Sequence, residues 1–441
     1  MARCLCLIYG AAFLCYGEDG VSNTEYLIMK ILNISLDKKL FEAGSRVEER
    51  VLEYAEIFDR FDILVLCGVG HEKKEFKKIV IWPTNSKNKL RYLLDALRLG
   101  GEMIKKYGCD LISVQEPFET GFIGWRLARK YGLKFQVQLH GDFFGSPYFR
   151  KESLLNRFRY YLGRFIIGRA DGIRAVSERI KKRLLEMGIK EEKISVVPIY
   201  VEVKSLSIRH AELVSASHEI PKQACPVKIL NQVQNDICGV RDDTFGVQRD
   251  GVKGKKFIFL TVGRLVAVKN IKMQIKAMAE VVKKYPEAEL WIVGEGNEKE
   301  KLKLKIENCH PMGDHSQGGK LQNYVKLYGW HNDLDEFYQK ADVFLLTSNY
   351  EGWGLAAVEA ASFGLPIIMT DVGCAGEVIV DEKSGLVVPV GDSEKLAENM
   401  QKLVSDEKLR KRLGEEAKNT VLGLPNKEKN LEMYKEACEK T

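Results

Sequence analysis

The chain has 441 residues, 45% of them hydrophobic and 29% charged, which is typical of a globular protein with room for two domains. No apolar run reaches the roughly 18 residues of a bilayer-spanning helix, no zinc-ligand spacing or basic arm indicates nucleic-acid binding, and the ten scattered cysteines favour reduced thiols over a disulfide framework. The net charge of +7 suits an acidic ligand or an anionic membrane surface.

Residues 1–28 precede the first convincing strand, and we expect them to form an N-terminal extension outside the fold. The apolar stretch Cys4–Tyr16, with Arg3 before it, is the alternative, a secretory signal. From Met29 the run M-K-I-L-N-I-S-L-D predicts the first strand of an α/β domain, at Ile31–Leu36.

Strands and helices alternate from residue 29 to residue 206, which predicts an N-terminal, acceptor-side domain with a doubly wound parallel sheet. Ligands of such sheets bind at the carboxyl ends of the strands, where Gly44 and His140 follow predicted strands. The further predicted strands are Ile63–Cys67, Ile79–Trp82, Leu111–Val114, Phe135–Leu139, Ala170–Val176 and Ile194–Val197. The predicted helices include Gly44–Phe58, Lys89–Tyr107 and a segment ending near Lys130.

The segment Arg150–Arg169 interleaves arginines with leucines and aromatic residues. One interpretation is an ordinary surface helix whose arginine stems cover apolar surface. The other is a helix that binds an anionic lipid surface.

The character of the sequence changes at residues 207–255, which show neither helical nor strand periodicity. Their H-A-E-L-V-S-A-S and L-N-Q-V-Q-N-D runs look like translated dispersed DNA repeats, so we expect a disordered insertion in the linker between two domains. A smaller polar insert, Asn308–Gln322, contains His310, Asp314 and His315, and its glycine-rich setting favours a solvated loop over a metal site.

A second α/β unit is predicted at residues 256–422, and residues 423–441 are expected to form a C-terminal helix, with packing back on the N-terminal domain as a candidate arrangement. The predicted strands are Phe257–Val262, Glu289–Val293, Val325–Tyr328, Val343–Thr347, Pro366–Thr370 and Gly385–Pro389. The predicted helices are Asn270–Lys284, Leu334–Lys340, Leu355–Phe363, Ser393–Val404 and Glu407–Val421. The two domains are expected to face one another across a ligand-binding cleft.

The stretch from Thr347 to Ala360 combines a buried strand end, a glycine turn and a helix start. Gly352 and Gly354 let the backbone approach a ligand, and the free N–H groups of a helix start suit a diphosphate. Glu351 lies on the turn, and Glu359 lies on the helix about 7–8 Å along the axis from Gly354. The two carboxylates are placed to hold a sugar at one end and a ribose at the other; the alternative is an ordinary helix terminus with unrelated acids.

Two cations follow the first strand of the second unit. Gly263 leaves room at the strand tip, and Arg264 and Lys269 lie on the loop into the next helix. Arginine grips phosphate oxygens bidentately and lysine acts as a point charge, so the pair is suited to neutralise a diphosphate. The alternative is two exposed basic residues in a basic protein.

The motifs Gly263-Arg264-Leu265, Gly294-Glu295-Gly296 and Glu351-Gly352-Trp353-Gly354-Leu355, with T-D-V-G-C-A-G-E-V-I and G-L-V-V-P-V-G-D, resemble the family four retaining glycosyltransferases of GT-B fold. Glu351 and Glu359 match that family's paired glutamates. The run A-D-G-I-R-A-V-S-E also fits the end of its first domain. The chain departs from the family pattern at Pro198–Glu202 and in carrying a single glycine, Gly44, where many relatives have a pair.

The resemblance implies a cytoplasmic or peripheral inner-membrane enzyme that moves a sugar from a nucleotide-diphosphate sugar, with retention and without a metal or other cofactor. Its implied acceptor is a glycan or lipid-linked intermediate of the cell envelope. In such enzymes Arg264 and Lys269 hold the diphosphate, Glu351 the sugar and Glu359 the ribose. Gly354 and Leu355 offer N–H groups to phosphate, Trp330 lies at the base and His140 meets the sugar. Alternatives are a phosphorylase, a sugar-nucleotide epimerase or a non-catalytic nucleotide-sugar-binding protein.

Overall fold

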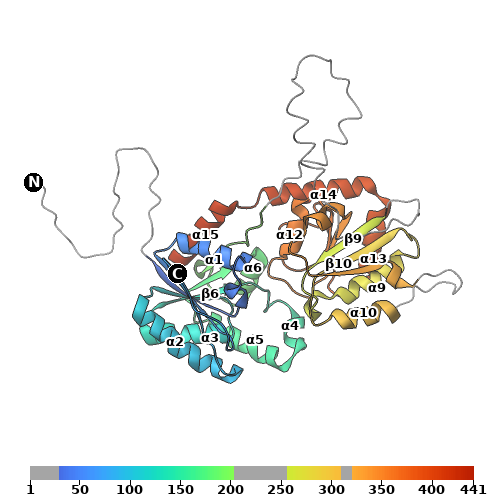
Figure 1. Ribbon diagram of the computed structural model, residues 1–441. Helices are drawn as coiled ribbons and strands as arrows, with labels where there is room; N and C mark the ends of the chain where they lie inside the picture. The colour runs from blue at the N-terminus through green and yellow to red at the C-terminus, as the bar shows by residue number, and fades with distance from the viewer. Residues whose placement is uncertain (1–28, 203–255, 309–319) are drawn as a thin grey trace, which may run out of the picture.

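The computed structural model describes residues 29–202, 256–308 and 320–441 (Figure 1). The predicted N-terminal extension, the whole of the linker insertion, and the histidines and aspartate of the polar insert lie outside these ranges.

The N-terminal unit is built on an eight-stranded sheet in the order β3-β4-β2-β1-β5-β6-β7-β8, in which only the β3–β4 pair is antiparallel. The strands are β1 (Lys30–Ser35), β2 (Arg60–Val65), β3 (Lys74–Phe76), β4 (Ile79–Pro83), β5 (Leu111–Val114), β6 (Lys134–Leu139), β7 (Gly172–Ala175) and β8 (Ile194–Val196). The helices are α1 (Arg46–Glu56), α2 (Tyr92–Tyr107), α3 (Glu119–Tyr131), α4 (Pro147–Glu152), α5 (Leu154–Ile167) and α6 (Glu178–Glu186), with 3-10 turns η1 (Lys38–Phe41), η2 (Lys89–Arg91) and η3 (Glu191–Lys193).

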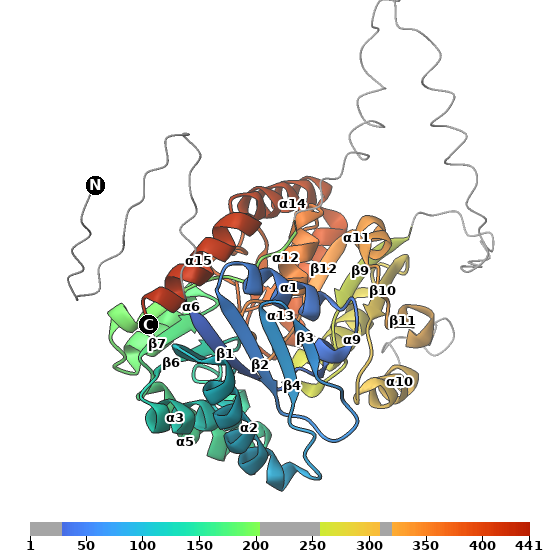
Figure 2. The ribbon, with the colours of Figure 1, turned by 60° about the vertical axis from the view of Figure 1, so that its left-hand side comes forward.

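Most side chains of the central strands are apolar and buried because helices cover both faces of the sheet, and Asn33, Gln136 and Gln138 are buried polar exceptions. Along β1 successive side chains point to opposite faces. Leu32 and Ile34 join a cluster with Leu99 of α2 and Leu127 of α3, whereas Ile31 packs with α1 and with the C-terminal helix. Helices α2, α3 and α5 lie side by side over the first of these faces (Figures 1 and 2).

The C-terminal unit has a six-stranded, fully parallel sheet in the order β11-β10-β9-β12-β13-β14. The strands are β9 (Phe257–Val262), β10 (Ala288–Val293), β11 (Val325–Gly329), β12 (Val343–Leu346), β13 (Ile367–Thr370) and β14 (Leu386–Val388). The helices are α9 (Ile271–Val281), α10 (Lys299–Asn308), α11 (Asp335–Lys340), α12 (Leu355–Ser362), α13 (Ser393–Ser405) and α14 (Glu407–Leu422), with turns η4 (Ala267–Lys269) and η5 (Leu321–Asn323). The predicted class, two doubly wound α/β domains, is confirmed.

The last helix, α15 (Lys427–Glu439), returns from the C-terminal unit to the N-terminal sheet (Figure 2). Tyr434 is 1% exposed and stacks on Tyr54 with ring centroids 4.3 Å apart. Gln138 Nε2 donates to Tyr434 Oη at 3.1 Å, and Gln136 Nε2 donates to the Ala437 carbonyl at 2.7 Å. The C-terminal helix is thus part of the N-terminal core.

Three local features differ from the sequence analysis. β3 and α10 were not predicted, and the basic amphipathic segment is divided into α4 and α5. The division falls at Ser153, whose Oγ accepts the Asn156 N–H at 3.0 Å and so begins α5 as an N-cap.

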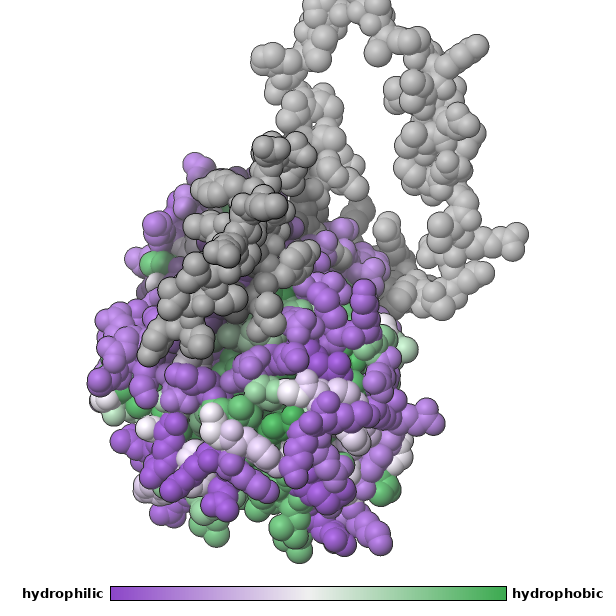
Figure 3. All heavy atoms as spheres, turned by 90° about the vertical axis from the view of Figure 1, so that its left-hand side faces the viewer, coloured by the Kyte–Doolittle hydropathy of each residue, from purple (hydrophilic) through white to green (hydrophobic). Residues whose placement is uncertain are grey.

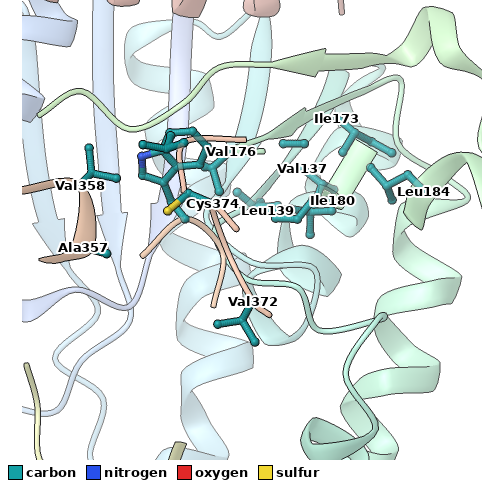
Figure 4. Packing of buried hydrophobic residues seen from close by; sticks show 14 of the residues in the cluster. Val137, Leu139, Ile173, Val176, Ile180, Leu184, Ala357, Val358, Val372 and Cys374 are labelled. Atoms are coloured by element: carbon teal, nitrogen blue, oxygen red, sulfur yellow. The ribbon is translucent and has the colours of Figure 1, made fainter. Parts of the chain in front are cut away.

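Apolar side chains from both units form one buried cluster at the domain boundary. Figure 4 shows Leu139 and Val176 of the N-terminal unit near Cys374 of the C-terminal unit. The cluster runs on to Val358 of α12, so the boundary between the two units is packed beside the start of that helix.

Candidate active site between the two domains

The predicted cationic loop and the predicted glutamate turn meet because β9 and β12 are parallel neighbours whose carboxyl ends lie at the same edge of the sheet. Lys269 Nζ lies 2.5 Å from Glu351 Oε1. Ser348 Oγ donates to the same oxygen at 2.6 Å. The side chains of Lys269 and Glu351 are 23% and 16% exposed, so this ion pair is largely, but not wholly, shielded from water.

A buried polar network fixes the backbone on both sides of this pair. Gln274 of α9 is fully buried and donates to Thr261 Oγ1 at 3.2 Å and to Thr347 Oγ1 at 2.9 Å. Thr347 Oγ1 in turn donates to the Lys269 carbonyl at 3.1 Å. Neither Gln274 nor Ser348 was predicted from the sequence as a site residue. The sequence signal that could have indicated a buried polar network here was a threonine near the end of each of the two strands, Thr261 in β9 and Thr347 directly after β12.

Helix α12 begins directly behind the glutamate turn. Gly354, at φ +90°, is its N-cap residue, a backbone conformation that favours glycine. No side chain caps this helix start, and its first turn contains no acidic residue. The N–H groups of Leu355 and its successor therefore keep the partial positive charge of a helix start, which suits an anion.

Glu359 lies further along α12 and is half-buried. Tyr338 of α11, which is 2% exposed, donates its hydroxyl to Glu359 Oε2 at 3.1 Å. The carboxylate is therefore held in a defined position, slightly more than one helical turn along α12 from Gly354.

The glycine loops after β9 and β10 pack on each other at the strand tips. A Cβ on Gly294 would lie 1.9 Å from the Gly263 carbonyl oxygen, and one on Gly296 would lie 2.2 Å from that of Leu265. Arg264, between these contacts, is exposed and forms no ion pair with any residue in the three described ranges. The structure thus joins Lys269 to Glu351 and leaves Arg264 at the rim.

The His140 turn of the N-terminal domain packs directly on the glutamate turn. A Cβ on Gly352 would lie 1.9 Å from the His140 carbonyl oxygen, and the Asp142 N–H donates to the Glu351 carbonyl at 3.3 Å. His140 Nε2 is buried and has no hydrogen-bond partner among the described residues. Burial, with the nearby positive charges of Arg174 and Arg50, lowers the pKa of His140 to about 3.

Gly44 and Trp330 are not in contact with the Lys269–Glu351 pair. Gly44, at φ +70°, donates its N–H to Glu48 Oε2 at 2.8 Å at the start of α1. The Trp330 ring is 57% exposed, with Lys39 Nζ 4.9 Å from its centroid. Lys39 and Gly44 both belong to the segment after β1, so this segment faces the Trp330 side of the C-terminal domain.

A second set of contacts joins the domains at the start of α6. Glu377 accepts the N–H groups of Glu178 and Arg179, each at 3.0 Å, as a helix cap supplied by the other domain. Arg179 Nη2 lies 2.5 Å from Asp371 Oδ1 and donates to the Ala375 carbonyl at 2.8 Å. A cavity of about 250 Å³, lined in part by Glu178, Glu377 and Trp353, lies beside these contacts.

Among residues 29–202, 256–308 and 320–441, no three His, Cys, Asp or Glu side chains are grouped so as to hold a metal ion. The helices of the same ranges are all too short or too polar to cross a bilayer.

Sequence comparison assigns each domain to a glycosyltransferase family. The family described as Glycosyltransferase Family 4 matches residues 49–204, and the family described as Glycosyl transferases group 1 matches residues 243–420. Each match covers less than half of the chain, and the two together support a glycosyltransferase of group 1.

Relatives of the chain match different shares of it. Poly(glycerol-phosphate) alpha-glucosyltransferase of Bacillus subtilis is 35% identical over 38% of this chain, but only 23% of that protein is covered. An uncharacterized glycosyltransferase of Methanocaldococcus jannaschii is 26% identical over 80% of this chain and 83% of its own length. The Escherichia coli UDP-Gal:alpha-D-GlcNAc-diphosphoundecaprenol alpha-1,3-galactosyltransferase is 23% identical, with 76% of each chain covered.

Solved structures share the architecture. Anabaena HepE in complex with UDP superimposes with a TM-score of 0.64 over 94% of this chain and all of that one, at 15% identity. Sucrose-phosphate synthase of Thermosynechococcus elongatus gives 0.68 over 92% and 98% of the two chains, at 19% identity. These similarities show that the two domains form a GT-B fold.

Proposed function

We propose that this chain transfers a sugar from a nucleotide-diphosphate sugar to a glycan or lipid-linked acceptor of cell-envelope synthesis, with retention at the anomeric carbon. The observation that carries the proposal is the Lys269–Glu351 pair, with Ser348 on the same carboxylate, at the tips of β9 and β12 beside the uncapped start of α12.

The donor diphosphate would lie between the start of α12 and the two cations. The Lys269 ammonium has three N–H donors, so it can keep Glu351 and also donate to a phosphate oxygen. Arg264, exposed at the rim and without an ion pair in the described chain, is available to bind phosphate bidentately. Together with the N–H groups of Gly354 and Leu355, these groups would stabilise the charge that develops on the leaving nucleotide.

The two glutamates would hold the rings at either end of the diphosphate. Glu351, fixed by Lys269 and Ser348, would accept hydrogen bonds from the donor sugar. Glu359, fixed by Tyr338, would accept them from the ribose. His140, uncharged at neutral pH because of its lowered pKa, would meet the sugar as a neutral hydrogen-bonding ring, and Trp330 and Gly44 would lie at the outer end of the donor site.

Retention would follow a front-side displacement assisted by the leaving phosphate, because the motifs supply no obvious nucleophile for the opposite sugar face. A covalent glycosyl-enzyme adduct, sought by mass spectrometry after rapid quenching, would contradict this path. The reaction is proposed to need no metal or other cofactor, because fixed cations and a helix terminus suit a diphosphate directly.

The acceptor and the location of the enzyme are also part of the proposal. The name of the Bacillus relative specifies poly(glycerol-phosphate), and that of the Escherichia relative specifies a diphosphoundecaprenol-linked sugar. Both names support an acceptor assembled at the cell envelope. We therefore expect the enzyme to act in the cytoplasm or at the inner face of the membrane.

A panel of nucleotide sugars tests the donor first. The cognate donor should raise the melting temperature of the wild-type protein, because a ligand that binds only the folded state stabilises it. The same donor should leave Lys269→Ala almost unshifted. Transfer of radiolabelled sugar to membrane lipid extract then tests the reaction, and NMR of the product shows its anomeric configuration. A panel in which no nucleotide sugar shifts the melting temperature would remove the proposal.

A further inference from the structure

The N-terminal domain carries an exposed apolar stripe along α5. Leu154, Phe158, Tyr161 and Phe165 follow one another at helical spacing and are 80%, 64%, 64% and 39% exposed. The opposite side of the same helix is already apolar and buried, through Ile166 and Ile167. Phe165 also contacts Trp125 of α3, with ring centroids 5.3 Å apart, whereas the largely exposed Leu154, Phe158 and Tyr161 contribute little to the packing of this domain.

A second exposed apolar group lies where α2 begins. Leu90 is 89% exposed, Leu94 63% and Leu93 37%. Helices α2 and α5 are the outer members of the layer α2-α3-α5, and both begin at the carboxyl edge of the parallel sheet. Figure 1 places the start of α2 and the whole of α5 at the lower edge of the domain, and Figure 3 shows hydrophobic atoms along that lower edge among hydrophilic ones.

The charges around these apolar groups are mostly positive. Residues 147–169 contain six basic residues and one acidic residue, Glu152, and residues 87–95 contain three basic residues and one acidic residue, Asp95. The neighbouring acid at the start of α3, Glu119, is paired with Arg159 at 2.7 Å. Exposed arginines, Arg157 and Arg164, flank the stripe on α5. We name Leu90, Leu94, Leu154, Phe158 and Tyr161 with these flanking cations the basic apolar face.

The basic apolar face is directly connected to the candidate active site. The hydroxyl of Tyr350, the residue before Glu351, donates to Glu152 Oε2 at 3.3 Å. Tyr350 also meets Phe149 of α4 with ring centroids 5.8 Å apart. Leu154 follows Glu152 by only two residues, so the stripe begins next to the residue that contacts Tyr350 of the glutamate turn.

We infer that the basic apolar face binds the surface of a bilayer rich in anionic lipid, and that it brings the cleft to the membrane so that a lipid-linked acceptor enters from the headgroup layer. This inference rests on the proposed function for its acceptor, and on the structure alone for the membrane contact. Apolar side chains enter the interface between headgroups and acyl chains, and the flanking cations attract the anionic headgroups. A neutral apolar partner would not need the positive charge, which is why we favour a charged lipid surface over a second copy of the chain.

Flotation with vesicles tests the membrane contact in the full-length protein. The wild-type protein should float with vesicles of phosphatidylcholine mixed with phosphatidylglycerol and should not float with phosphatidylcholine alone. The double variant Leu154→Glu/Phe158→Glu should lose at least tenfold in vesicle binding. Arg157→Ala/Arg164→Ala should lose about fivefold for each removed charge.

The matched control is Leu304→Glu/Leu422→Glu, which changes two leucines that are each 57% exposed on the other domain. This control should float like the wild type. All of these side chains are exposed, so unchanged melting temperatures would show that the fold is retained. Equal flotation of the wild type on both kinds of vesicle, or equal flotation of all variants, would overturn the inference. A wild-type dimer that Leu154→Glu/Phe158→Glu dissociates in sedimentation would instead assign the face to a second copy.

Transfer assays separate this inference from the proposed function. Leu154→Glu/Phe158→Glu should transfer sugar to a detergent-dispersed acceptor at the wild-type rate and should lose at least tenfold with the same acceptor in anionic vesicles. Equal rates with both acceptor forms would overturn the delivery role. If the wild-type protein floats normally but transfers no sugar, the proposed function is rejected and the inferred membrane contact stands.

Discussion

The two sides of the candidate cleft are built differently. On the C-terminal side, the predicted side chains are tied to one another, as in the pair of Lys269 and Glu351 with Ser348 on the same oxygen. On the N-terminal side, His140 Nε2 has no partner in the described chain, and the N–H of Gly44 is already used by Glu48. The difference indicates that the C-terminal side, where we propose that the donor binds, is pre-organised by the protein, whereas the N-terminal side would mainly supply shape and closure.

The largest expected effect is on the pre-organised side. Lys269→Ala removes the partner of Glu351 and a cation for the diphosphate, and Glu351→Ala removes the carboxylate that Lys269 and Ser348 orient. Each should lower kcat/KM by about 10³-fold, as expected for a lost transition-state contact. The matched control is Lys283→Ala, which removes an exposed pair with Glu280 and should leave turnover unchanged. Near-normal turnover of either variant would place the chemistry elsewhere.

The next effect tests closure between the two sides. In Gly352→Ala the new Cβ would lie 1.9 Å from the His140 carbonyl oxygen, a backbone atom that cannot move aside without moving the turn. We expect the domains to separate slightly and transfer to fall by about 10²-fold, with each domain still folded. Gly68→Ala is the control, because its Cβ would meet nothing closer than 3.9 Å. Small-angle scattering that shows an unchanged radius, together with unchanged kinetics, would contradict this expectation.

A pH series tests the unpaired histidine. The pKa of His140 is about 3 in the folded protein and near 6.5 in the unfolded chain, so between these values the unfolded state binds the extra proton. Stability should therefore fall as the pH is lowered through 6.5, by about 2 kcal/mol at pH 5 from this group alone. Urea unfolding of the wild type and of His140→Gln at pH 7 and pH 5 measures the difference. Parallel pH dependences in the two proteins would show that His140 is solvated.

The smallest effect concerns the contacts at the start of α6. Arg179→Ala removes a partly exposed ion pair with Asp371 and a hydrogen bond to the Ala375 carbonyl. We expect a loss of about 1 kcal/mol and a rise of a few-fold in donor KM, since exposed pairs contribute little. Arg183→Ala, on the same helix and paired only locally with Glu186, is the control. Identical stability and KM in the two variants would exclude a role of Arg179 in domain closure.

The elements that could be predicted are those with a strong pattern. Leu111–Val114 and Phe257–Val262 were predicted with the bounds that the structure has, because each run is apolar except for one small hydroxyl residue, Ser113 or Thr261. The helix α10 was missed because Leu302, Leu304 and Ile306 alternate with charged residues, a period of two rather than 3.6. The strand β3 was missed because it is short, charged and at the sheet edge.

The candidate site was only partly accessible to sequence reasoning. Motif residues with distinctive chemistry, such as Lys269 and Glu351, could be identified from their setting, and their roles stay predictions. Gln274 could not be identified, because its importance depends on which two strands become neighbours in the sheet. Gln274 and Thr347 are 73 positions apart, so their spacing along the chain does not indicate that the two side chains are in contact.

The return of α15 to the first domain has a consequence for biosynthesis. Tyr434, near the end of the chain, fills the space between Tyr54 and Phe58, and a Cβ on Gly172 would lie 2.2 Å from Thr441 Oγ1. The ribosome must therefore synthesise nearly all of the described chain before α15 is available to cover this face of the N-terminal sheet. We expect nascent chains that lack α15 to expose an apolar surface and to require a chaperone until translation passes this helix.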